Sequence, residues 1–184
     1  LSSNDCNIAL VLMSNAQYAW CQCFAAFVPD HMPADWGWQV FCAVRDFFQS
    51  QLAEHAALIE QVRDARDIRG IVDSGKCAGM FTVEGGSFIE GSLDRLHAAA
   101  DAGVKMLTLT WNGKNAIASG NVTTDGLSTF GAQVVHAMEQ RRMVVDVSHL
   151  NDASFWDVVK ASSRPFAASH SNSRAVCGHP RNLT

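Results

Sequence analysis

The chain lacks several features that would place it in a class at once. It has no run of roughly 18 apolar residues, the length that crosses a bilayer, and Leu1–Asn7 has neither the basic start nor the apolar stretch of a signal peptide. It also has no run of Lys or Arg, and its formal net charge is −4. A basic face is needed to neutralise phosphates. We therefore expect no transmembrane segment and no nucleic-acid partner, and the sequence leaves open a leader before Leu1.

A C-x-x-C motif is also absent, although the chain has six cysteines. Two of them are two residues apart and the others stand alone: Cys21 and Cys23, then Cys6, Cys42, Cys77 and Cys177. This spacing predicts neither a zinc cluster nor a disulfide framework. Free cysteines are frequently buried as small hydrophobes, so we expect structural thiols in a reducing compartment, which favours the cytoplasm.

What the sequence does contain is an alternation of apolar runs and amphipathic stretches. With 48% hydrophobic residues, 184 residues can form one globular domain, residues 1–184. Predicted strands end near Pro29, Glu84, Trp111, His149 and His170, and predicted helices cover Gln39–Arg66 (one helix or two), Leu93–Ala102, Ser128–Arg142 and Asn151–Ser162. This β-α alternation predicts an α/β fold with a parallel sheet, either doubly wound or a (β/α)8 barrel.

The number of predicted strands bears on how complete that fold is. A closed TIM barrel needs eight strands and typically about 250 residues, more than this chain provides. The alternation also stops soon after His170, without a final strand. We therefore expect an incomplete (β/α)8 barrel of roughly five or six βα units.

Three of the predicted strands end in residues that can bind a metal. Val144–His149 and Pro165–His170 are apolar runs that each end in a histidine, and Ala78–Val83 leads into Glu84. In α/β proteins the carboxyl ends of the strands form the ligand site. Two imidazoles and a carboxylate suit zinc, and a fourth coordination position open to water is typical of a hydrolytic site. An isolated histidine at a strand end is more often a packed residue, but three such residues together predict metal ligands: Glu84, His149 and His170.

A carboxylate near these histidines is a candidate for a supporting role. Histidine ligands normally donate their second ring nitrogen to a carboxylate or a carbonyl group. Asp146 is close enough in sequence, but strand alternation places His149 on the face of Val145 and Val147 and points Asp146 away from it. Asn112 and Asn115, in the loop after the fourth strand, could orient that loop or touch a substrate, and the sequence does not decide between these roles.

Several short segments, taken in order, carry a family resemblance. They are Thr82-Val-Glu-Gly-Gly86, Leu107-Thr-Leu-Thr-Trp-Asn112, Gly126-Leu-Ser-Thr-Phe-Gly131, Asp146-Val-Ser-His149, Ser169-His-Ser-Asn172 and His179-Pro-Arg-Asn182. From about Ala16 onward the chain resembles the membrane dipeptidase (renal dipeptidase) family of zinc peptidases. The resemblance implies a TIM barrel of the metallo-dependent hydrolase type with two Zn²⁺ ions at its mouth, which hydrolyses dipeptides by a metal-activated hydroxide.

The resemblance also assigns roles to individual residues. It implies that Glu84 bridges the two zinc ions, that His149 and His170 bind one of them, and that Arg181 binds the substrate carboxylate. A planar guanidinium can bind both carboxylate oxygens. Family members are commonly dimers, so a homodimer is a further expectation.

The chain departs from the family pattern in three places. The family takes further ligands from a His-x-Asp motif on its first strand, and nothing before His31 provides it. The aspartate that shuttles a proton to the leaving amine is expected beyond Thr184, and Trp111 stands where some members have a histidine. We therefore expect this chain alone to be an incomplete enzyme that supports one zinc ion and lacks the first-strand motif and the last strands.

Two alternatives to the dipeptidase remain at this point. One is a related amide or lactam hydrolase that uses a single zinc ion, which Trp111 and the missing ligands suggest. The other is a non-catalytic relative, in which the barrel serves binding or assembly and the histidines are structural.

Overall fold

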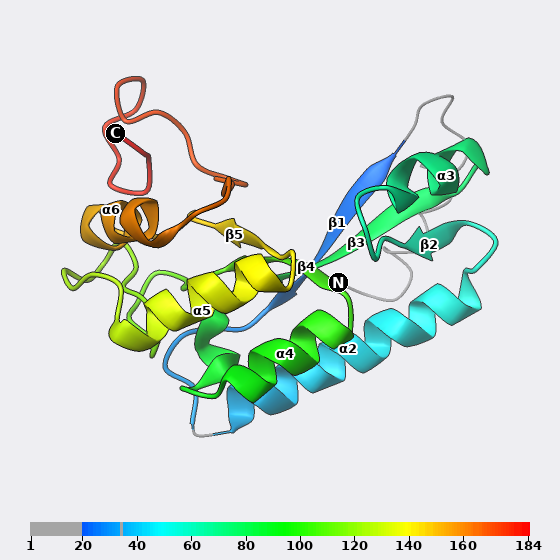
Figure 1. Ribbon diagram of the computed structural model, residues 1–184, viewed down its shortest axis with the longest axis horizontal. Coiled ribbons are helices and arrows are strands. Elements are labelled where there is room, and N and C mark those ends of the chain that lie inside the picture. Colours follow the sequence, from blue (N-terminus) through cyan, green and yellow to red (C-terminus); the bar gives the residue numbers. More distant parts are fainter. Residues whose placement is uncertain (1–19, 34) are drawn as a thin grey trace.

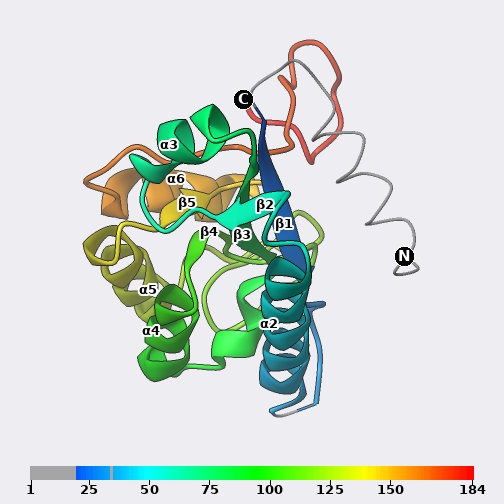
Figure 2. The same ribbon diagram turned by 90° about the vertical axis from the view of Figure 1, so that its right-hand side faces the viewer.

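The computed structural model describes residues 20–33 and 35–184, and in this part a parallel sheet packs against helices (Figures 1 and 2). The strands are β1 (Cys21–Phe27), β2 (Ile59–Gln61), β3 (Cys77–Glu84), β4 (Val104–Thr108) and β5 (Val144–Asp146). The helices are α2 (Trp36–Glu54), α3 (Asp67–Asp73), the 3-10 turn η1 (Gly86–Ile89), α4 (Leu93–Asp101), α5 (Thr129–Gln140) and α6 (Asp152–Ala161). Cys6 lies outside the described residues. The expected α/β class with a parallel sheet is confirmed.

The sheet is built around β3. Strand β1 pairs with β3 along its whole length, while the other edge of β3 pairs with β2 near its start and with β4 near its end; β5 lies beyond β4. All these pairings are parallel. In this register, Phe27 lies opposite Glu84, Glu84 opposite Thr108, and Thr108 opposite Asp146. The carboxyl ends of four strands therefore form one level row, and any side chain placed there shares one rim.

The core lies between the sheet and helices α2, α4 and α5, which line one of its faces (Figures 1 and 2). Phe81 and Val83 of β3 are buried there, and Phe81 stacks on Phe48 of α2 with ring centroids 4.6 Å apart. Phe41 of α2 stacks in the same way on Phe88 of η1 at 4.7 Å. Burying one such aromatic side chain stabilises a fold by about 1.5–3 kcal/mol. This layer fixes β3 against its helices, and Glu84 is the last residue of that strand.

The predicted helix boundaries agree with the structure where capping residues mark them. Ser128 caps α5 by accepting a hydrogen bond from the Gly131 amide at 2.8 Å, and Asn151 caps α6 by accepting one from the Ser154 amide at 2.8 Å. After α4, Gly103 takes a left-handed conformation with φ 92°. Such a conformation favours glycine and ends a helix.

The prediction of one or two helices over Gln39–Arg66 is wrong in its second half. Helix α2 ends at Glu54, and Ile59–Gln61 forms β2 instead. Gly79 of β3 explains the packing there, because a Cβ atom at this position would lie only 2.9 Å from Ile59 Cδ1. The apolar spacing was compatible with a helix, but tertiary pairing with β3 decided the local structure.

The predicted strand Pro165–His170 is also wrong as a strand. The segment runs parallel to β5, as expected, but only one bridge forms, in which Ala167 donates to the Val145 carbonyl at 2.9 Å and accepts from the Val147 amide at 2.8 Å. Beyond that bridge, the amides of Ser148 and Ser169 both donate to a side-chain oxygen of Asp146 instead of to backbone carbonyls. The ladder therefore stops at Asp146, and β5 is shorter than the predicted run to His149.

The outer edge of the sheet is open at β1 in the described residues. Cys21 and Cys23 are exposed there, and an apolar cavity of about 310 Å³ lies between β1 and α2, lined by Phe24, Phe47 and Phe48 among others.

Among the residues described, no helix combines the length and apolar character needed to span a bilayer. Whether the sheet belongs to a closed barrel stays a prediction.

Candidate metal centre

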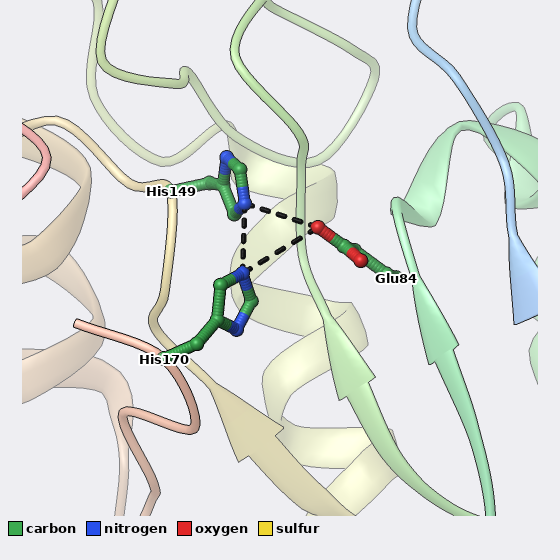
Figure 3. Close-up of side chains that lie close together, drawn as sticks. All are labelled: Glu84, His149 and His170. Carbon is green, nitrogen blue, oxygen red and sulfur yellow. Dashed lines mark hydrogen bonds and ion pairs between the residues drawn. The ribbon is translucent and has the colours of Figure 1, made fainter. Parts of the chain in front are cut away.

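The carboxyl-terminal rim of the sheet brings together the three residues that the sequence singled out. His149 Nε2 lies 3.0 Å from Glu84 Oε1, His170 Nε2 lies 3.5 Å from the same oxygen, and the two Nε2 atoms are 2.9 Å apart (Figure 3). Their side chains point toward one another from three different segments. His149 is buried, Glu84 is partly buried and His170 is exposed. The group therefore has one solvent-accessible side.

Glu84 is held in place by the backbone around it. Its carbonyl accepts a hydrogen bond from the Val28 amide at 2.8 Å, and the next amide, of Gly85, donates to the Thr108 carbonyl at 3.2 Å. Gly85 has φ 98°, and a Cβ atom there would collide with the Val28 carbonyl oxygen. Only glycine fits this close approach. The contact with His149 lowers the pKa of Glu84, although burial opposes this shift, so the carboxyl group is ionised at neutral pH.

His149 lies in a turn beyond β5 rather than at the strand end. Its φ of 73° is unusual for a residue with a side chain, and such strain is typical of functional sites. Its carbonyl accepts from the Asn121 amide at 2.9 Å, and its Nδ1 lies 3.0 Å from Asn112 Oδ1. Asn121 also donates from its side chain to Asn112 Oδ1 at 2.7 Å. The loop after β4 therefore holds both the backbone and the ring of His149.

His170 is supported from the other side. Its Nδ1 lies 2.7 Å from Ser169 Oγ, and Ser169 Oγ donates to Asp146 Oδ2 at 2.6 Å. Its backbone amide donates to Ser148 Oγ at 3.1 Å. The supporting role considered for Asp146 is thus directed to His170 through Ser169. The alternation argument separated Asp146 from His149 only.

Asp146 is a fully buried carboxylate with four hydrogen bonds from three residues. The Ser148 and Ser169 amides donate to Oδ1, and the hydroxyls of Thr108 and Ser169 donate to Oδ2, each at 2.6 Å. Burial on its own would raise the pKa of this group, but these hydrogen bonds outweigh it and hold the pKa of Asp146 below its usual value. The carboxylate is therefore ionised although it is buried at the carboxyl end of β5.

Arg181 lies beside this group, on the segment that follows His170. Its guanidinium donates to Ser171 Oγ at 3.3 Å and to the His170 carbonyl at 3.4 Å. Burial lowers the pKa of the Arg181 side chain, while the carboxylates of Glu84 and Asp146 oppose that shift. The guanidinium is thus close enough to Glu84 and Asp146 to interact electrostatically with both carboxylates.

The donor atoms present fit a zinc ion. In a tetrahedral zinc site with bonds of about 2.0–2.2 Å, ligand atoms lie about 3.3 Å apart. The separations here, from 2.9 to 3.5 Å, bracket that value. Two imidazole nitrogens and one carboxylate oxygen are also the ligand types that zinc takes in catalytic sites.

Sequence reasoning missed the residues that support this centre. The sequence does not decide the role of Asn112 and does not single out Ser148 or Ser169. Both serines bond to His170: Ser169 Oγ lies beside its Nδ1, and Ser148 Oγ accepts from its backbone amide. Asp30 was also missed; its buried carboxylate accepts from the Gly113 amide at 2.7 Å and fixes the loop that carries Asn112. No local pattern marked these contacts, because most of them join residues far apart in the chain.

Relatives with known sequences match over most of this chain. It is 30% identical over 160 residues to an uncharacterized protein from the pqqA 5′ region of Klebsiella pneumoniae, covering 83% of this chain and 58% of that protein. It is 30% identical over 142 residues to an uncharacterized protein from the PQQ-III 3′ region of Acinetobacter calcoaceticus, covering 73% and 45%. The chain therefore spans about half the length of the relatives it matches.

Solved structures share the fold of this chain. A metallo peptidase from Rhodobacter sphaeroides, liganded with a phosphinate mimic of the dipeptide L-Ala-D-Ala, superposes with a TM-score of 0.86 at 23% identity and covers 96% of this chain and 58% of its own. A dipeptidase of family M19, a metallo peptidase, superposes with a TM-score of 0.84 at 27% identity and covers 95% and 56%. At 23% identity, the likeness to the Rhodobacter structure shows a shared fold and nothing more.

The family model described as membrane dipeptidase (Peptidase family M19) matches residues 9–184, nearly the whole chain. The matched range includes the strand ends that form the centre. The chain therefore belongs to the membrane dipeptidase family, Peptidase family M19.

Proposed function

We propose that the protein represented by this chain is a zinc-dependent dipeptidase that hydrolyses the peptide bond of dipeptides. The observation that carries the proposal is the convergence of Glu84, His149 and His170 at one rim, with their ligand atoms within 4.8 Å of one another, in a chain of a metallopeptidase family. The phosphinate dipeptide mimic bound to the Rhodobacter relative supports a small dipeptide as the substrate.

Each residue of the centre has a defined task in this proposal. Glu84, His149 and His170 would hold the metal, and the open side of His170 leaves access for substrate. When bound, zinc supplies Lewis acidity, which polarises a scissile carbonyl and lowers the pKa of water. Arg181 would bind the terminal carboxylate of the dipeptide, since its guanidinium already lies along the His170 backbone.

We further propose that the complete fold is a (β/α)8 barrel, of which residues 1–184 form one incomplete domain. In that barrel the exposed edge of β1 would be paired. A second zinc ion would need the His-x-Asp motif upstream, and the proton donor to the leaving amine would be an aspartate beyond Thr184. An open reading frame that encodes this chain and contains neither motif would contradict the two-zinc dipeptidase.

Activity assays test the proposal directly. The full-length protein that contains this chain should hydrolyse members of a panel of L,L- and L,D-dipeptides when zinc is supplied, and Glu84→Gln and His170→Ala should each abolish turnover. Matched controls are Glu54→Gln and His136→Ala, which replace the same residue types at exposed positions on α2 and α5. Arg181→Met should raise KM more than it lowers kcat, because it removes a contact to the substrate carboxylate. No hydrolysis by a folded, zinc-loaded protein would contradict the proposal.

The second candidate is an amide or lactam hydrolase with a single zinc ion. It is favoured by Trp111, whose ring lies 6.3 Å from that of His149 and stacks edge-on against Phe27 at 5.3 Å. This makes the rim apolar where some family members have a histidine. About one zinc ion per chain, with cleavage of lactams and not of dipeptides, would favour this candidate.

A further inference from the structure

We propose that Asn112 on one side and Ser169 with Asp146 on the other are positioning residues, which hold Nδ1 of His149 and His170 so that both rings present Nε2 to a metal ion. The inference rests on the proposed function and deepens it, because it assigns the supports of that site. It concerns residues that do not themselves touch metal or substrate.

The first support acts on His149. Asn112 Oδ1 accepts a hydrogen bond from the Asn121 side-chain amide at 2.7 Å. An amide oxygen can only accept, so the proton between it and His149 Nδ1, at 3.0 Å, belongs to the ring. A neutral His149 ring is then the Nδ1–H tautomer, whose Nε2 carries a lone pair.

The second support acts on His170 through a hydroxyl. Ser169 Oγ has one proton, and it lies 2.6 Å from Asp146 Oδ2, an ionised oxygen that can only accept. The hydroxyl proton therefore goes to Asp146, and Ser169 Oγ accepts from His170 Nδ1 at 2.7 Å. A neutral His170 ring is thus also the Nδ1–H tautomer, and two hydrogen bonds in series connect it to the buried carboxylate of Asp146.

Together the two supports leave three lone-pair donors facing one another. The Nε2 atoms of His149 and His170 are 2.9 Å apart, and Glu84 Oε1 is 3.0 Å from the nearer of them. A ring that carries its one proton on Nδ1 offers Nε2 as a ligand atom. Three ligand atoms aimed at one point are what a metal ion requires, so the supports hold the rim in the arrangement that a metal ion would use.

Zinc affinity of paired variants tests the inference. Asn112→Ala and Ser169→Ala remove the acceptors, whereas Asn112→Asp and Ser169→Thr keep an oxygen in the same place. The exposed side chain of Asn172, two residues after His170, provides the control variant Asn172→Ala. Affinity is measured by competition with a chromophoric chelator. Two-dimensional ¹⁵N NMR of the zinc-loaded chain reports which ring nitrogen carries the proton.

We expect zinc affinity to depend on whether each variant keeps an acceptor oxygen beside Nδ1. Each alanine variant should bind zinc about 10–100-fold more weakly, the usual effect of losing such a partner, while the Asp, Thr and control variants stay within about threefold of the parent. In the parent, both rings should show Nδ1–H. A merely structural role would not be rescued by Asn112→Asp, since that change adds a charge to the loop.

Two outcomes separate the inference from the proposed function. If the parent binds zinc and the folded alanine variants bind it equally well, or if either ring is metallated at Nδ1, the inference is overturned and the metal site stands. If the folded parent takes up no zinc, the metal site and the proposed function fail together with the inference. Zinc binding with the expected pattern but no dipeptide hydrolysis by the protein would overturn only the proposed function.

Discussion

Replacing Asp146 with asparagine should destabilise the fold at neutral pH and leave its shape nearly unchanged. The change is isosteric, so the packing around β5 is retained. The substituted side chain would keep an oxygen for the Ser148 and Ser169 amides but would present an NH₂ group to the two hydroxyls that now donate to Asp146 Oδ2, those of Thr108 and Ser169. Both hydroxyls would have to turn and become acceptors.

The size of the effect follows from these contacts. A hydrogen bond to a charged group contributes about 1.5–3 kcal/mol, and one between neutral groups about 0.5–1.5 kcal/mol. Converting the bonds from Thr108 and Ser169 to neutral ones should therefore lower the free energy of unfolding by about 2 kcal/mol. Asp146→Asn destabilises the fold only if the folded protein favours the ionised carboxylate over the neutral form. The lowered pKa of Asp146 shows this preference.

The pH dependence gives the prediction a second, independent check. Because the folded pKa of Asp146 is lowered, its contribution is fully present above the unfolded value of about 3.9 and is lost as pH falls through the folded value. The difference between parent and Asp146→Asn should thus be largest near neutral pH and shrink below about pH 4. Urea unfolding over this pH range measures it, with the exposed Asp46→Asn as the control. Equal stability of the parent and Asp146→Asn at pH 7 would refute the reasoning.

Four further predictions test other parts of the structure. Ser128→Ala removes the α5 cap and should cost about 1 kcal/mol in urea unfolding, and an unchanged midpoint would contradict the capping role. Glu139→Gln should speed hydrogen exchange in residues 163–170, because the buried carboxylate accepts from Ser163 and the next amide; unchanged exchange would rule out this anchor. Zinc should raise the melting temperature and a chelator should reverse the rise, since metal binds the folded state, and no shift would argue against the centre. The isolated chain should self-associate through the edge of β1, which no other described strand pairs, and a clean monomer in size-exclusion chromatography would contradict this.

The fold could be predicted from sequence where local signals were strong. The predicted apolar run Ala78–Val83 leads into Glu84 and two glycines, and β3 spans Cys77–Glu84. Ser128 and Asn151 begin helices as capping residues should. The second half of Gln39–Arg66 could not be predicted, because its apolar spacing fits a helix and the competing strand pairing involves Gly79, far along the chain.

The convergence of Glu84, His149 and His170 was predictable from the sequence, but the residues that contact them were not. Three strand-end residues of suitable type pointed to Glu84, His149 and His170, because parallel strands bring their carboxyl ends to one edge. Strand alternation failed beyond Asp146, where the chain turns and His149 takes a left-handed conformation. The roles of Asn112 and Ser169 depend on contacts across the sheet, and no sequence spacing encodes them.

Zinc K-edge absorption spectroscopy, combined with metal analysis of the purified chain, tests the central claim most directly. The account predicts a bound zinc ion with nitrogen and oxygen ligands at about 2.0–2.2 Å in the parent. It also predicts that the triple variant Glu84→Ala, His149→Ala, His170→Ala loses that ion, whereas the control His136→Ala retains it. A folded parent without zinc, or a triple variant that keeps the same zinc environment, would contradict the account.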